Sequence, residues 1–132
     1  MGAEAYQYVV DYQFNVKAAL AKLRQEVFAS GEYNGAERKP KSPEAALEMA
    51  GADGTRSILD ILRIGSKPDH FVAAPLTPAE YQRYFGTDKP ALESIQECDD
   101  LWDDIERGMA RYVFTYENGR PTKIVFLGYS FD

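Results

Sequence analysis

Carboxylates are concentrated in one stretch of this sequence, between Asp88 and Glu106. The stretch holds eight carboxylates and one lysine, a net charge of −7, whereas the whole chain of 132 residues has a net charge of −6. Like charges three or four residues apart destabilise a helix by about 0.2–0.5 kcal/mol per pair. Because a face that serves only solubility would gain from alternating signs, the run indicates a docking face for a basic partner protein. An exposed, solubilising face is the simpler alternative.

The residues predicted to bind this partner share one side of a helix when placed at 100° per residue. They are Glu97, Asp99, Asp100, Asp103 and Asp104. Carboxylates also bind Mg²⁺ or Ca²⁺, but one helix supplies only one side of a coordination sphere, and the sequence has no calcium-binding loop motif. We therefore predict a basic protein partner, no metal site and no cofactor. An immunity protein or enzyme inhibitor would dock in this manner.

A second group of residues forms the alternative hypothesis, a small-molecule-binding protein or an enzyme with a polar pocket. His70 follows Asp69 directly, and a histidine oriented by a carboxylate can act as a general base. Asp60 and Arg63 are charges in an otherwise aliphatic stretch, so each needs a partner. Tyr81 completes the predicted pocket. The simpler interpretation is a structural pairing of Asp60 and Arg63, with a solvated His70.

Composition and charge disfavour other classes of function. A net charge of −6 and a pI near 4.8 argue against nucleic acid or an anionic membrane surface as the main partner. The single cysteine, Cys98, rules out a disulfide scaffold and suits a reducing compartment. The sequence shows no secretory signal and no apolar run of about 18 residues, so we predict a cytoplasmic protein without a membrane span.

Hydrophobic spacing, capping residues and turn residues predict the elements that position these side chains. In chain order the predicted elements are strand 6–14, helix 16–30, helix 43–50, strand 57–64, strand 71–74, helix 77–85, helix 90–107 and a hairpin of strands 111–116 and 122–129. The order β-α-α-β-β-α-α-β-β predicts one α+β domain over residues 1–132. Its sheet of about five strands should be mostly antiparallel, with the helices packed mainly on one face.

Three details of these elements remain open. The stretch 57–64 is apolar on both faces, so a buried helical turn is possible, but its β-branched content favours a central strand. The helix 90–107 should bury its apolar residues, Leu92, Ile95, Trp102 and Ile105. The hairpin turns at Asn118 and Gly119, and we predict a bulge at Gly119. This register pairs Tyr112 with Ile124 and places both on one face with Phe114 and Phe126.

Overall fold

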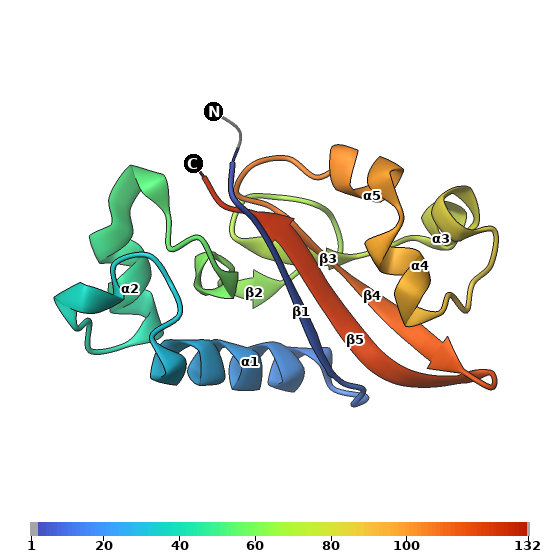
Figure 1. Cartoon of the computed structure of the whole chain (residues 1–132), viewed down its shortest axis with the longest axis horizontal. Coiled ribbons are helices and arrows are strands. Elements are labelled where there is room, and N and C mark those ends of the chain that lie inside the picture. Colours follow the sequence, from blue (N-terminus) through green and yellow to red (C-terminus); the bar gives the residue numbers. More distant parts are fainter. Residues whose placement is uncertain (1–2, 132) are drawn as a thin grey trace.

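A five-stranded sheet organises the computed structural model, which describes residues 3–131 (Figure 1). Its strands are β1 (Ala5–Asp11), β2 (Arg63–Ile64), β3 (Val72–Pro75), β4 (Ala110–Glu117) and β5 (Arg120–Tyr129). The strand order is β1-β5-β4-β3-β2. β5 pairs antiparallel with β1 and with β4. The short strand β3 pairs parallel with β4 on one side and with β2 on the other. The predicted α+β class is confirmed, with a mixed sheet in which the antiparallel pairs are the longer ones.

Five α-helices connect the strands within residues 3–131. They are α1 (Val16–Ser30), α2 (Pro43–Ala50), α3 (Pro78–Phe85), α4 (Leu92–Gln96) and α5 (Asp99–Asp103). The predicted ends of the first three are present, because Asn15, Ser42 and Thr77 each accept a backbone N–H of their helix. Glu80 completes a capping box with Thr77 at the start of α3. Among the described residues, no helix is long and apolar enough to cross a membrane.

The helices cover both faces of the sheet, so the prediction that they lie mainly on one face is wrong. α1 and α2 pack on the face that carries Tyr112 and Phe126. α3, α4 and α5 pack on the opposite face, which carries Val113, Val125 and Leu127. Side chains alternate along a strand, and both faces of the central strands β4 and β5 are apolar. Each face therefore needs its own cover.

The predicted helix over 90–107 is instead two short helices, broken at Glu97 and Cys98. The backbone at Cys98 has φ −93° and ψ 84°, outside the helical region. The break gives each short helix its own N-terminal turn, with Glu93 in α4 and with Asp99 and Asp100 in α5. The helix dipole stabilises carboxylates there. A continuous helix would instead have stacked like charges along its whole length.

The break also changes which apolar side chains of this stretch are buried. Ile95 and Ile105 are buried as predicted, whereas Leu92 and Trp102 are only half-buried. Leu101, which the single-helix stripe leaves out, is fully buried. A helical stripe keeps its phase only while the helix is continuous, so the break at Cys98 moves α5 out of register with α4.

The stretch 57–64 is a strand only at its end. Residues Ile58–Asp60 form a 3-10 turn that Ser57 caps by accepting the Leu59 N–H at 3.1 Å. Ile58, Leu59 and Ile61 are all fully buried. A tight turn can send consecutive side chains into one core, whereas a strand alternates them. The predicted strand is therefore wrong for 57–60, where the helical-turn alternative holds, and right for Arg63–Ile64.

The hairpin has a two-residue turn, because Asn118 and Gly119 both have positive φ and flank no bulge. The bulge lies further along β5: Tyr116 pairs with Pro121 and Thr115 pairs with Lys123, so Thr122 between them is the extra residue. As a result Tyr112 pairs with Phe126, so both the predicted pairing and the predicted bulge position are wrong. The predicted face is right, since Tyr112, Phe114, Ile124 and Phe126 belong to one core cluster.

Candidate functional site

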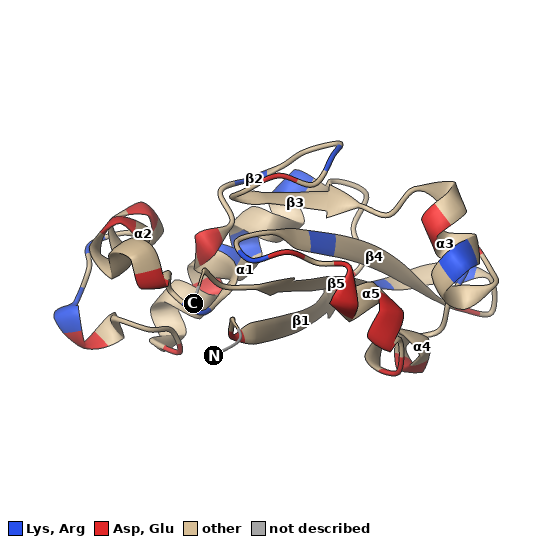
Figure 2. Ribbon diagram, turned by 90° about the horizontal axis from the view of Figure 1, so that it is seen from above, with Lys and Arg blue, Asp and Glu red and all other residues tan. Residues whose placement is uncertain are grey.

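An acidic segment, residues 92–106, packs on the face of the sheet opposite α1 and α2. Figure 2 shows its Asp and Glu residues in red on α4 and α5. The five carboxylates predicted from the sequence are all exposed: Glu97, Asp99, Asp100, Asp103 and Asp104. Glu93 and Glu106 of the same segment are exposed as well. The structure therefore presents seven carboxylates on one short stretch of surface.

The acidic segment is held by apolar side chains that pack against the sheet. Ile95 and Leu101 are fully buried in the core cluster that contains Val113 and Leu127. The Trp102 ring packs edge-on against Tyr129, with centroids 5.6 Å apart. Because each short helix inserts a buried side chain into the core, the carboxylates project from a fixed base.

Asp104 differs from the other four predicted residues because it has a counterion. Its carboxylate accepts hydrogen bonds from the Arg83 guanidinium at 2.7 Å and from the Tyr84 hydroxyl. Burial raises the pKa of Tyr84, and the hydrogen bond to Asp104 raises it further. In the described part of the chain, Asp99, Asp100 and Asp103 have no ion pair. Their charges are therefore available to a partner.

A hollow of about 430 Å³ lies between α3 and the acidic segment. Its lining residues include Tyr84 and Phe85 of α3 and Glu97, Asp99 and Asp100 of the acidic segment. The guanidinium carbon of Arg83 lies 4.6 Å from the centroid of the Tyr84 ring, so that ring already has one cation over it. Aromatic rings beside carboxylates attract the side chains of arginine and lysine, through cation–π contacts and charge-assisted hydrogen bonds. The hollow thus has the chemistry to accept a cationic side chain.

The four residues of the predicted polar pocket do not meet. Arg63 is exposed on β2, and His70 is exposed in a turn where its ring stacks on Phe131 at 6.1 Å. The Tyr81 hydroxyl accepts the Phe114 N–H on the other side of the sheet, and burial raises its pKa to about 12. Asp60 is fully buried. The structure therefore does not bring Asp60, Arg63, His70 and Tyr81 into one site.

Asp60 is the centre of a buried polar cluster that the sequence did not predict. Its Oδ1 accepts the Thr55 N–H at 2.6 Å and the Thr55 hydroxyl at 2.7 Å. Burial raises the pKa of Asp60, and these hydrogen bonds oppose the rise. A Cβ at Gly54 would lie 2.8 Å from both Asp60 Oδ2 and Ser130 Oγ, so only glycine fits there. The cluster joins the 55–60 turn to the end of β5 and has no access to solvent.

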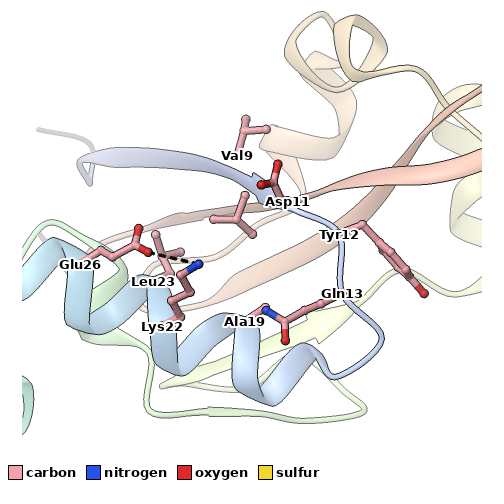
Figure 3. Close-up of a pocket in the computed structure, with 9 residues that line it drawn as sticks. Val9, Asp11, Tyr12, Gln13, Ala19, Lys22, Leu23 and Glu26 are labelled. Carbon is pink, nitrogen blue, oxygen red and sulfur yellow. Dashed lines mark ion pairs between the residues drawn. The ribbon is translucent and has the colours of Figure 1, made fainter.

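A second hollow, of about 290 Å³, lies between α1 and the edge strand β1 (Figure 3). Its charged residues are already paired: Lys22 with Glu26 at 4.0 Å, and Asp11 with Lys123 at 2.6 Å. Among the described residues, no group of three or more His, Cys, Asp or Glu side chains is placed to hold a metal ion. This hollow offers no unbalanced charge to a ligand.

No protein-family model, curated protein or solved structure matches this chain.

Proposed function

We propose that this chain is an interaction protein that docks a basic surface of another protein through the acidic segment. The observation behind the proposal is the set of exposed carboxylates that have no ion pair within residues 3–131, namely Asp99, Asp100 and Asp103. Asp99 and Asp100 also line the hollow between α3 and the segment. The single Cys98 supports a cytosolic setting, which remains a prediction.

The energetics favour a partner over an isolated acidic face. A pair of opposite charges 4 Å apart is worth about 1 kcal/mol in bulk water and about 4 kcal/mol at the effective dielectric constant near a protein surface. A field of one sign also steers association and raises on-rates by about 10- to 1,000-fold. Several carboxylates without an ion pair in the described part of the chain therefore supply both affinity and a fast association rate to a basic partner.

The concentration of negative charge suits a partner whose basic site normally binds phosphates. An immunity protein or an inhibitor that covers a nuclease or another nucleotide-handling site would present carboxylates in place of phosphates. An arginine or lysine of that partner would enter the hollow lined by Tyr84, Phe85 and Glu97.

The test compares two variants with the same net charge. Asp99→Asn/Asp100→Asn/Asp103→Asn removes three charges from the acidic segment, and Glu32→Gln/Glu37→Gln/Glu48→Gln removes three exposed charges elsewhere. Each variant changes the net charge from −6 to −3. Binding of an oligolysine peptide is measured by fluorescence anisotropy at low and high salt. We expect the first variant to lose about tenfold or more in affinity, and the control to lose much less.

Equal losses in the two variants would show that only net charge matters, and would leave the segment as a solubilising face. Binding to wild type should also weaken steeply with salt, because the Debye length falls from about 10 Å at 0.1 M to about 3 Å at 1 M. Binding that salt does not weaken would contradict an electrostatic docking face.

A further inference from the structure

α1 and the edge strand β2 enclose a third hollow, of about 340 Å³, on the opposite face of the sheet from the acidic segment. All its charged residues are basic: Lys17 and Arg24, two turns apart on α1, and Arg63 on β2. The apolar lining consists of Leu20, Ala21, Leu62 and Ile64. A basic hollow is unexpected in a chain of net charge −6. Figure 2 shows blue segments on α1 and beside β2, and red ones on α4 and α5.

The guanidinium of Arg24 has donors that the protein leaves unused. Its side chain is only 12% exposed, and Nη1 donates to Glu44 Oε2 at 3.1 Å. Nε and Nη2 are buried and have no hydrogen-bond partner among residues 3–131. These two N–H groups form one edge of the guanidinium, which matches the two oxygens of a carboxylate or a phosphate. The ion pair with Glu44 fixes the position of the Arg24 guanidinium, but it gives no acceptor to the edge formed by Nε and Nη2.

The other two cations of the hollow, unlike Arg24, have no carboxylate partner among the described residues. Lys17 and Arg63 are exposed, and neither has an ion pair within the described part of the chain. Because Glu44 neutralises Arg24, the hollow retains two unbalanced positive charges, those of Lys17 and Arg63. Buried donors and uncompensated cations beside apolar walls are the features of a site for an anion with an apolar part.

We propose that this hollow binds a small amphiphilic anion, whose carboxylate or phosphate headgroup lies on the free edge of Arg24. Lys17 and Arg63 contribute positive charge to the headgroup, and the apolar part of the ligand packs against Leu20, Leu62 and Ile64. The volume is near the lower end of small-molecule sites, which span about 300–1,000 Å³, so the ligand is compact. The site does not depend on the docking function of the acidic segment.

Leu62 lines the hollow together with Arg24. It directly precedes β2 and is 43% exposed, whereas Leu20 on the α1 side of the hollow is buried. It also borders a neighbouring apolar hollow of about 560 Å³, whose lining includes Leu47, Phe71 and Phe131. Leu62 thus stands between two hollows, and its side chain has open space on both sides.

The experiment measures binding of octanoate and octyl phosphate by calorimetry, with octylamine as the probe of opposite charge. Saturable binding of one or both anions, and none of octylamine, is the expected result, and the comparison identifies the preferred headgroup. Arg63→Gln and Lys17→Gln alter exposed residues and should each weaken binding about tenfold, as loss of a charged contact does. Lys22→Gln is the matched control, because it removes the same charge from α1 at the hollow of Figure 3, and it should change affinity less than about twofold.

Arg24→Lys keeps the charge but removes the two-donor edge, and it should weaken binding more than Arg63→Gln does. In wild type, the side-chain Nε–H resonance of Arg24 should shift on titration with the preferred anion. The proposal is overturned if neither anion binds, if octylamine binds equally well, or if Lys22→Gln costs as much affinity as Arg63→Gln.

Discussion

The ion pair between Arg111 and Glu80 provides a direct test of how the fold is held together. Arg111 lies on β4 with its side chain 7% exposed, and Glu80 lies on α3 at 24%. The two guanidinium Nη atoms donate to the two carboxylate oxygens at 3.1 and 2.6 Å. Glu80 also accepts the Thr77 N–H of its own capping box. The change Glu80→Gln removes the negative charge and one of the acceptors while keeping the size of the side chain.

The structure sets the size of the effect. Breaking a buried ion pair by removing one partner costs about 3–5 kcal/mol. Glu80 is partly exposed, and Arg111 keeps the Ala74 and Pro75 carbonyls as acceptors, so the cost should be smaller. The amide oxygen of glutamine also retains one acceptor. We therefore expect Glu80→Gln to lower the free energy of unfolding by about 2 kcal/mol at neutral pH.

The loss should depend on pH in one direction. The hydrogen bonds from Arg111 are the largest cause that holds the pKa of Glu80 below its ordinary value of 4.5. A lowered folded-state pKa stabilises the fold above the unfolded value, and this stability is lost as pH falls through the folded value. The gap between wild type and Glu80→Gln should thus be full above pH 4.5 and should shrink at lower pH.

Urea unfolding followed by the fluorescence of Trp102, the only tryptophan, measures this gap. Glu48→Gln is the control, because Glu48 is exposed and has no ion pair among the described residues, and it should change stability by less than about 0.5 kcal/mol. A loss at Glu80 as small as that of the control, or a gap that does not shrink in acid, would refute the reasoning.

Two further stability predictions follow from buried or half-buried side chains. Burial raises the pKa of Asp60 above its ordinary value of 3.8, so the stability that its protonated form contributes is fully present below pH 3.8 and is lost as pH rises through the folded-state pKa. The stability of wild type relative to Asp60→Asn should therefore fall as pH rises. Denaturant melts across that range that show no such fall would contradict a buried, titrating Asp60. Trp102→Ala should lower the free energy of unfolding by about 1–3 kcal/mol. The loss should be smaller than for a fully buried tryptophan, because Trp102 is half-buried and packs edge-on against Tyr129. Melts followed by circular dichroism that show no loss would mean that this packing does not hold the acidic segment.

Local signals in the sequence predicted much of the fold. Asn15, Thr77 and Gly86 act within one turn of their own helices, so their sequence context was sufficient to place helix ends. Alternation along the hairpin likewise predicted which face holds Tyr112 and Phe126. The exposure of the five carboxylates of the acidic segment also followed from sequence polarity alone.

Features that depend on distant contacts were not predictable. The break at Cys98 depends on where Ile95 and Leu101 contact the sheet, which the sequence does not show. The apolar spacing continues across both short helices and therefore predicts one long helix. Asp60 is solvated or buried according to where Thr55 and Ser130 lie, and Ser130 is 70 residues away in the sequence. The basic hollow likewise joins α1 to β2, which are far apart in the sequence, so no local pattern brings Lys17 and Arg24 together with Arg63.

Mapping where a polycation binds tests the docking function most directly. Amide chemical shifts of the isotope-labelled protein would be recorded during titration with an oligolysine peptide at low salt. The largest shifts are expected in residues 92–106 and at Tyr84 and Phe85, which line the adjoining hollow, and they should collapse at high salt. Shifts spread evenly over all exposed carboxylates, or centred on Glu44 and Glu48 of α2, would contradict a docking face on the acidic segment.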